Sequence, residues 1–291
     1  MKILITGCQG QVGASLVNKL MNDSNIALLA LSRAELDITD LYAVRKVVCE
    51  YKPHFIINAA AYTAVDQAQT DIDNCYAINR DGADNLAQAA EQVKATILHL
   101  STDYVFSGSK RESYLEHDPT DPKSIYGQSK LAGELAVAKK CSRHIILRTA
   151  WVFSEYGNNF VKTMLKLAAS HTSLNIVEDQ HGGPTYAGDI AQALITIAKS
   201  LYQNTSPRYG IYHFSGFPHT SWYEFSKEIF NQAQIQGLII DKPNVQAIPS
   251  TDYPTAAERP RNSSLNCLLI HDSFGINQSD WKQALKHLNQ Y

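Results

Sequence analysis

The sequence predicts an α/β protein built on a doubly wound parallel sheet, with a smaller C-terminal lobe. Short apolar runs alternate with longer helical patterns through the first half of the chain. Right-handed crossovers between such runs give a parallel sheet with helices on both faces. The 291 residues and the hydrophobic content of 44% suit one large folded unit. The net charge of -2 argues against binding to nucleic acid or to an anionic membrane surface.

The alternation occupies the first 150 residues. Nearly all-apolar runs, typical of strands buried on both faces of a sheet, lie at 2–6, 26–31, 55–58, 96–101 and 144–148. Segments with helical spacing lie between them, at 12–21, 41–51, 74–93 and 126–140. We therefore expect one domain at 1–150. Gly, Pro and aromatic residues become frequent afterwards, which indicates a smaller lobe at 151–291, interleaved with a strand and a helix near 173–201 that return to the main sheet.

A glycine-rich turn joins the first predicted strand to the first helix. Its Gly-x-x-Gly-x-x-Gly spacing allows a tight turn, a close backbone approach and close helix packing. Free N–H groups at the helix start favour an anion, which predicts a dinucleotide-binding domain of the Rossmann type. A purely structural turn is the alternative. The residues predicted to contact the cofactor here are Gly7, Gln9, Gly10, Gln11, Val12 and Gly13.

The ends of the next two strands complete the predicted cofactor site. Ser32 and Arg33 stand where an NAD-specific site usually has an acid, and an Arg can meet a 2′-phosphate, so they favour NADPH. NADH use stays open, as does a solvated surface role for Arg33. Asp37 and Ile38 are expected beside the adenine. Small side chains after the third strand leave room for the cofactor at Ala59, Ala60 and Ala61.

Three side chains predict proton transfer to a carbonyl group. Tyr126 and Lys130 lie about one helical turn apart on one face, where the ammonium can stabilise a phenolate and lower the tyrosine pKa. Thr102 ends the fourth strand at the edge where such sheets bind ligands, and its hydroxyl can orient a carbonyl oxygen. Tyr126 is then the general acid as a hydride arrives. A Tyr–Lys surface pair is the alternative.

Motifs along nearly the whole chain resemble the extended short-chain dehydrogenase/reductase superfamily. Those shared across the superfamily are 7–13, 58–66, 101–106 and 126–134. The resemblance also covers 148–152 and 157–160, and Trp151 and the segments 179–185 and 259–263 resemble more closely the members acting on a dTDP-linked ketosugar. The resemblance implies reduction of the C4 keto group of dTDP-4-dehydro-6-deoxy-L-mannose to dTDP-L-rhamnose, a precursor of surface polysaccharide. It makes Thr102, Tyr126 and Lys130 the catalytic residues, with Tyr126 and Lys130 also at the cofactor and Lys130 on the nicotinamide ribose.

The resemblance also implies substrate contacts. Asp103 and Tyr104 would lie beside the sugar, and Trp151 would form a wall of its pocket. Arg259 would meet the diphosphate with Asn262 near it, because a buried dianion in a near-neutral protein needs a local cation. A plain core aromatic and a surface ion-pair partner are the alternatives for Trp151 and Arg259. The smaller lobe is then the substrate-binding lobe.

Two rival functions share these motifs. An epimerase or dehydratase on a sugar nucleotide has the same fold and Tyr–Lys pair, but dehydratases usually carry two acids after the strand-four Thr, and here Asp103 is followed by Tyr104. The second rival function is that of a non-catalytic NADP-binding regulatory subunit. The intact Tyr126–Lys130 pair argues against it.

No metal is predicted. Some relatives are thought to pair through a magnesium ion held by glutamates, and Ser15 and Gly188 stand at the matching positions. The odd number of cysteines, five, with no close pair, argues against disulfides and zinc and favours a reducing compartment. No signal peptide or apolar span is recognisable. We expect a cytoplasmic protein, a monomer or homodimer, with no membrane or nucleic-acid partner.

Overall fold

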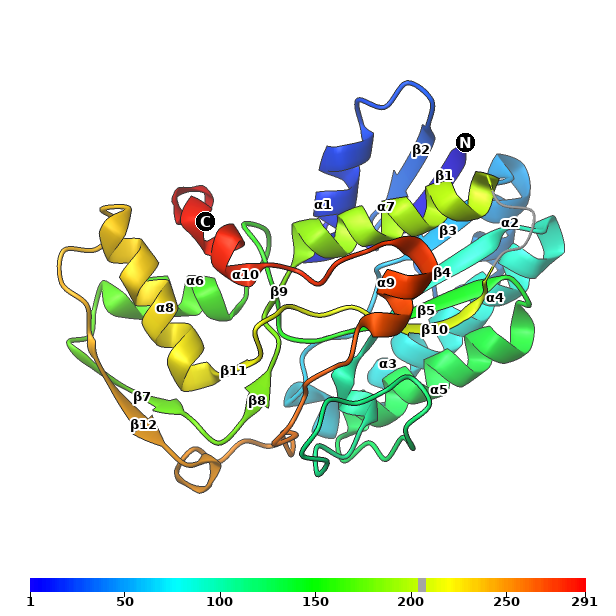
Figure 1. The fold of residues 1–291 in the computed structure, drawn as a ribbon. Helices are drawn as coiled ribbons and strands as arrows, with labels where there is room; N and C mark the ends of the chain where they lie inside the picture. Colours follow the sequence, from blue (N-terminus) through cyan, green and yellow to red (C-terminus); the bar gives the residue numbers. More distant parts are fainter. Residues whose placement is uncertain (204–207) are drawn as a thin grey trace.

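The computed structural model describes residues 1–203 and 208–291 as a larger lobe around one sheet and a smaller lobe beside it (Figure 1). The described residues form a central sheet of six strands, all parallel, in the order β10-β5-β4-β3-β1-β2. The strands span Lys2–Thr6 (β1), Ala27–Leu31 (β2), Phe55–Asn58 (β3), Thr96–Thr102 (β4), His144–Thr149 (β5) and Gly210–His213 (β10). The predicted parallel sheet is confirmed.

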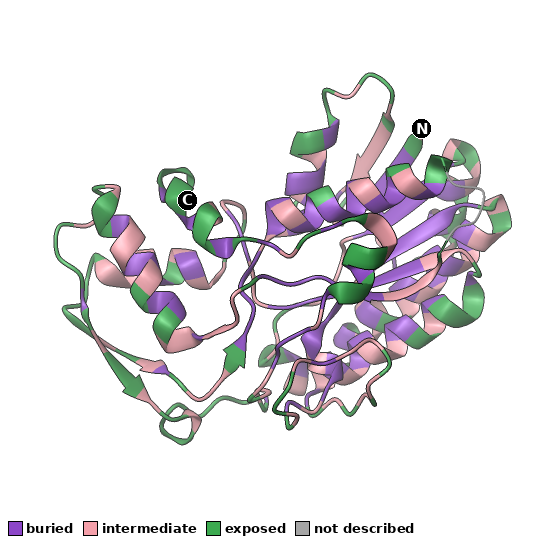
Figure 2. Cartoon of the chain, viewed as in Figure 1, coloured by how far each residue is buried: buried purple, intermediate pink, exposed green. Residues whose placement is uncertain are grey.

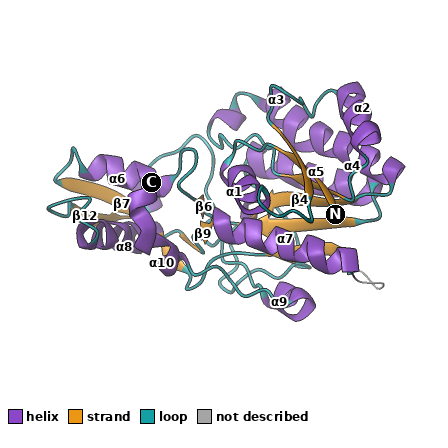
Figure 3. Ribbon diagram, turned by 90° about the horizontal axis from the view of Figure 1, so that it is seen from above, coloured by secondary structure: helices purple, strands orange, loops and turns teal. Residues whose placement is uncertain are grey.

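Helices cover both faces of this sheet (Figure 3). Because side chains alternate along a strand, Ile3 and Ile5 of β1 enter the core under α1 and α7, whereas Leu4 enters the core under α2, α4 and α5. Figure 2 shows the central strands buried between these layers and β2, at the edge of the sheet, only partly buried. The helices span Gln11–Leu20 (α1), Leu41–Tyr51 (α2), Ile72–Tyr76 (α3), Gly82–Val93 (α4), Ile125–Lys140 (α5) and Ala187–Gln203 (α7), and a π-helical turn, Ala77–Asp81, joins α3 to α4.

The order of the strands locates the ligand crevice. β1 has β2 on one side and β3 on the other, so the chain changes direction across the sheet between β1 and β3. Open α/β sheets bind ligands outside the carboxyl ends of the strands at such a point. The turns after β1, β2 and β3 carry most of the predicted cofactor residues, Thr102 ends β4, and Tyr126 and Lys130 lie at the start of α5. The fold therefore gathers these residues at one edge of the sheet.

The smaller lobe packs around aromatic side chains, including buried Phe153, Phe225 and Trp281. Its helices are Phe160–Ala168 (α6), Trp222–Ile235 (α8) and Trp281–Ala284 (α10), while Leu268–Phe274 (α9) contacts β10 and α7 of the larger lobe. Its paired strands are Ser173–Val177 (β7) with Asn244–Ile248 (β12), Val152–Phe153 (β6) with Thr185–Tyr186 (β9), and His181–Gly182 (β8) with Thr220–Ser221 (β11).

The expected return of a strand near 173–177 to the main sheet is wrong. β7 pairs with β12 in a separate sheet of the smaller lobe. The alternating polar and apolar residues of β7, Ser-Leu-Asn-Ile-Val, suit a small sheet with one face open to solvent. β10, whose Tyr212 and His213 are buried, takes the place beside β5 instead. The helix expected in the same region does lie on the main lobe, as α7 against α1. Within the described ranges, no helix is long and apolar enough to cross a bilayer.

Candidate active site

The glycine turn after β1 exposes its backbone to a ligand. Gly7 has a φ of 72°, and a Cβ on it would come 2.6 Å from the backbone nitrogen of Ala60. A Cβ on Gly13 would collide with the Gly7 carbonyl. Gly10 stands at the N-cap of α1 and has no side chain to occupy the N–H groups of the first turn. These N–H groups are therefore available to an anion such as a pyrophosphate.

A cavity of about 240 Å³ opens beside this turn. Its walls come from the glycine turn, the ends of β2 and β3, and one residue of the π-helical turn: Gly7, Gln9, Gly10, Ser32, Arg33, Leu36, Asp37, Ile38, Ala59, Ala60, Ala61 and Ile78. All but Leu36 and Ile78 are residues that the sequence predicts at the cofactor. The exposed backbone and the short alanine side chains fit a dinucleotide.

Sequence reasoning missed Glu35, whose carboxylate lies at the end of β2. Its Oε2 accepts hydrogen bonds from the hydroxyl and the N–H of Ser32, at 2.7 and 2.8 Å. These two donors lower the pKa of Glu35. The acid lies beyond the strand end and folds back, so its position in the sequence gave no signal. Arg33 lines the cavity and can meet a phosphate, whereas Glu35 lies outside the cavity walls and holds Ser32, which lines it.

Gln11, Val12 and Gly13 lie outside the walls of this cavity. Val12 is buried in the core, and the Gln11 side chain turns toward the smaller lobe. Their backbone N–H groups belong to the first turn of α1, where a pyrophosphate would bind. Their role at the cofactor stays a prediction.

A buried polar network supports the strand ends from below. The side-chain oxygen of Asn58 accepts from the Thr6 hydroxyl at 2.9 Å and from the Ala60 N–H at 3.1 Å. The Asn58 amide donates to Nδ1 of His99 at 3.0 Å. Burial lowers the pKa of His99, which keeps this ring neutral and able to accept that bond. Thr6, Asn58 and His99 thus hold β1, β3 and β4 in register under the cofactor cavity.

Thr102, Tyr126 and Lys130 meet where β4 ends against the start of α5. Lys130 is buried, and its Nζ donates to the Leu100 carbonyl at 2.6 Å. The buried Thr102 hydroxyl neighbours the phenol of half-buried Tyr126. The close approach of α5 depends on Gly127, because a Cβ there would collide with the Tyr104 carbonyl.

The expected lowering of the tyrosine pKa is not found. Burial raises the pKa of Tyr126, and the Thr102 hydroxyl opposes that shift. Burial also lowers the pKa of Lys130 to about 8. The Lys130 ammonium is engaged by the Leu100 carbonyl, so it is not committed to a phenolate. The chain alone therefore keeps Tyr126 protonated at neutral pH, which is the form that a general acid needs.

Asp103 and Tyr104 adjoin this centre. Asp103 is 3% exposed; its Oδ1 accepts from the Thr102 hydroxyl at 2.9 Å, and its Oδ2 has no hydrogen-bond partner among the described residues. Burial raises the pKa of Asp103 to about 6. The Tyr104 ring packs edge-on against Tyr126, with centroids 5.5 Å apart. The Ser263 hydroxyl lies near the Asp103 carboxyl and opposes the rise of its pKa. The contact of Asp103 with a substrate stays a prediction.

A second cavity, of about 510 Å³, lies between the lobes. Its walls are Val65, Asp66, Tyr104, Phe160, Thr163, Met164, Leu167, Leu174, Asn175, Ile176, Val177, Gln180, Trp222, Tyr253, Thr255 and Arg259. Tyr104 connects it to the catalytic residues. Arg259 is at its wall, ion-paired with Asp66 at 2.5 Å. Trp151 is not among these walls, and its ring stacks on Trp222 with 3.5 Å between centroids.

Asn262 is apart from the two predicted ligand cavities. Its amide donates to the carbonyls of Lys110 and Glu112, at 2.8 and 2.9 Å, and its oxygen accepts from the Ser264 N–H at 3.0 Å. These bonds hold the loop at 110–112 against the C-terminal segment. Asn262 therefore has its polar atoms occupied, and its contact with a substrate stays a prediction.

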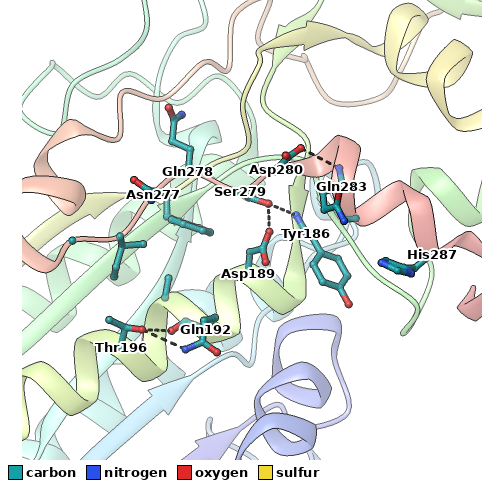
Figure 4. Close-up of a pocket in the computed structure, with 15 residues that line it drawn as sticks. Tyr186, Asp189, Gln192, Thr196, Asn277, Gln278, Ser279, Asp280, Gln283 and His287 are labelled. Carbon is teal, nitrogen blue, oxygen red and sulfur yellow. Dashed lines mark hydrogen bonds between the residues drawn. The ribbon is translucent and has the colours of Figure 1, made fainter. Parts of the chain in front are cut away.

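A third cavity, of about 530 Å³, lies between α7 and the C-terminal segment (Figure 4). The Ser279 hydroxyl donates to Asp189 there at 2.6 Å. None of the predicted site residues is among its described walls. Throughout 1–203 and 208–291, no group of three or more His, Cys, Asp or Glu side chains is placed to hold a metal ion. The expectation of a metal-free enzyme stays a prediction.

Comparison with known proteins identifies close relatives over the full length. The model of the family described as "RmlD substrate binding domain" matches residues 1–291. A dTDP-4-dehydrorhamnose reductase from Aggregatibacter actinomycetemcomitans is 48% identical over 290 residues, covering 100% of this chain and 99% of the relative. A solved dTDP-4-dehydrorhamnose reductase from Clostridium acetobutylicum has a TM-score of 0.91 at 38% identity, covering 98% of this chain and 97% of that one. The Bacillus anthracis reductase, solved with NADP, has a TM-score of 0.90 at 37% identity, covering 99% and 98%.

Proposed function

The chain belongs to the RmlD substrate binding domain family, and we propose that it reduces the C4 keto group of dTDP-4-dehydro-6-deoxy-L-mannose to dTDP-L-rhamnose with NADPH. The observation that carries the proposal is the meeting of Thr102, Tyr126 and Lys130 at the end of β4, beside Tyr104 and the interlobe cavity. Full-length relatives named for this reaction support the same substrate.

The cofactor site is assigned to the glycine turn and the ends of β2 and β3. N–H groups at the start of α1 would hold the pyrophosphate, and the alanine wall would leave room for the nicotinamide half. Lys130 would bind the nicotinamide ribose. NADPH is the preferred cofactor because Arg33 lines this cavity, and NADH is the alternative.

Proton transfer is assigned to Tyr126. When bound, NADPH would supply a hydride to the carbonyl carbon. The Tyr126 phenol donates to the carbonyl oxygen and releases its proton as negative charge develops there. The Thr102 hydroxyl can rotate from Asp103 to the same oxygen and orient it. Lys130, once drawn from the Leu100 carbonyl toward the site, stabilises the phenolate that is left.

The substrate is assigned to the interlobe cavity. Arg259 would bind the diphosphate, Asp103 and Tyr104 would contact the sugar, and Trp151 would support that pocket through its stack on Trp222. Asn262 would act near the diphosphate through the loop that it holds. We further assign the protein to the cytoplasm, as a monomer or homodimer that needs no metal.

An NADPH absorbance assay tests this function. Purified protein is mixed with NADPH and the dTDP-linked ketosugar, or with its GDP or UDP counterpart. We expect one NADPH consumed per molecule of the dTDP-linked substrate. Turnover without net NADPH consumption would indicate an epimerase or dehydratase instead. No oxidation with any of the three, together with a stable protein complex, would indicate a regulatory subunit.

A further inference from the structure

Asp66 anchors the cation at the wall of the interlobe cavity. It follows β3 in the larger lobe, whereas Arg259 lies far along the chain, in the segment between β12 and α9. Its Oδ2 accepts from Nη2 of Arg259 at 2.5 Å, and its Oδ1 accepts from the N–H of Ala257 at 3.0 Å. One carboxylate therefore fixes both the guanidinium and the backbone that carries it.

The guanidinium retains one unsatisfied arm. Nη1 of Arg259 is buried and forms no hydrogen bond among the described residues, and the Tyr104 phenol lies close to the guanidinium, whose charge opposes the rise of the Tyr104 pKa on burial. A charged donor without an acceptor is unfavourable in a protein interior. The wall of the cavity thus lacks an acceptor for this N–H group. A diphosphate offers anionic oxygens at a spacing that matches the parallel N–H groups of a guanidinium.

The position of this arm suits a sugar nucleotide. The guanidinium carbon of Arg259 lies 6.0 Å from the centre of the Tyr104 ring. The same Tyr104 ring packs edge-on against the Tyr126 ring, with 5.5 Å between the two ring centres. One aromatic ring therefore separates the cation from the proton donor, so an anion at Arg259 would lie near the linked sugar at Tyr126.

We infer that Asp66 is a positioning residue that orients Arg259, so that the free arm of the guanidinium meets the diphosphate of the substrate. This inference rests on the proposed function, which gives the cavity a sugar nucleotide. The Asp66 side chain is 47% exposed, and a pair this open contributes little to stability. A substitution of Asp66 should therefore change the affinity for the ligand and leave the free energy of unfolding nearly unchanged.

The test compares Asp66→Asn and Asp66→Glu with a matched control, Asp81→Asn. Asp81 pairs with Arg80 and is 49% exposed, outside both ligand cavities. Calorimetry with dTDP and with thymidine, each with NADPH present, measures affinity without turnover. We expect Asp66→Asn to weaken dTDP binding about tenfold, thymidine binding to stay unchanged, and Asp66→Glu to recover most of the loss. KM for the sugar nucleotide should rise by a similar factor with kcat preserved.

Two results would overturn the inference. One is dTDP affinity in Asp66→Asn equal to that of the wild type. The other is an equal loss of dTDP and thymidine, which would mean that Asp66 merely shapes the cavity. Failure of the proposed function looks different: the wild type would oxidise no NADPH with the ketosugar, while the selective loss of dTDP binding in Asp66→Asn would still support the positioning role.

Discussion

Asn159 donates a hydrogen bond from its side-chain amide to Oε1 of Gln11 at 3.0 Å, and this contact joins the two lobes. Gln11 opens α1 directly after the glycine turn, and Asn159 is the N-cap of α6 in the smaller lobe. The Ser154 hydroxyl donates to the same oxygen at 3.1 Å. The Gln11 side chain therefore links the glycine turn to the smaller lobe.

Replacing Gln11 with Ala should weaken both ligand sites. The variant leaves the Asn159 amide and the Ser154 hydroxyl without this acceptor, so KM should rise for the sugar nucleotide and for NADPH. The free energy of unfolding should fall by about 1–3 kcal/mol. Urea unfolding and steady-state kinetics measure both, with the exposed Gln192→Ala on α7 as the control. A KM change for NADPH alone would show that Gln11 serves the cofactor and does not couple the lobes.

Breaking the buried pair of Arg148 and Glu134 should strongly destabilise the larger lobe. Two hydrogen bonds, of 2.7 and 2.9 Å, join side chains that are only 3% and 2% exposed, and Ser101 donates to the same carboxylate. Glu134→Gln leaves a buried guanidinium without its counter-charge and should cost about 3–5 kcal/mol. Urea unfolding measures this cost. A loss below 1 kcal/mol, roughly that of an exposed pair, would mean that solvent reaches the guanidinium.

The pH dependence of kcat/KM should report Lys130. Its pKa in the folded chain is about 8, below the ordinary 10.5, because burial disfavours the ammonium. The cation is needed to stabilise the phenolate, so kcat/KM at low NADPH should fall as the pH rises through about 8. In stability, the cost of the buried charge is present below that pH and disappears as the pH rises toward 10.5. Lys130→Arg should move the fall in kcat/KM to higher pH, because a guanidinium stays charged. An unchanged profile would assign the titration to another group.

Trp151 should act on the substrate through Trp222. Its ring stacks on Trp222, and its backbone has a left-handed φ of 48°. Trp151→Ala removes the support of a cavity wall, so KM for the sugar nucleotide should rise while the affinity for NADPH holds. Trp151→Phe should retain part of the stack. Kinetics with each substrate varied in turn distinguish the two effects, and an equal change for both would contradict the assignment.

The sequence predicted the elements that local pattern determines. The strands 2–6 and 55–58 and the helix 41–51 match the structure residue for residue, because continuous apolar runs and helical spacing are properties of the segment itself. The glycine turn could also be predicted, because its spacing indicates what each glycine does in the turn.

Features that depend on tertiary contacts could not be read in this way. β7 pairs with β12, some 70 residues further along the chain, and nothing in the sequence of β7 itself indicates that partner. The raised pKa of Tyr126 comes from burial that no spacing reveals, and Glu35 reaches Ser32 only because the chain folds back. Asp66 lay within a motif but gained a role only when Arg259 was found beside it.

The role of Tyr126 is tested most directly by single-turnover hydride transfer in Tyr126→Phe. Wild type and variant are preloaded with NADPH and mixed with the dTDP-linked ketosugar, and loss of NADPH absorbance is followed. We predict that NADPH binds the variant normally while transfer slows by about 10²–10⁴-fold, because the carbonyl oxygen receives no proton. Transfer at the wild-type rate would contradict the assignment of Tyr126 as the proton donor.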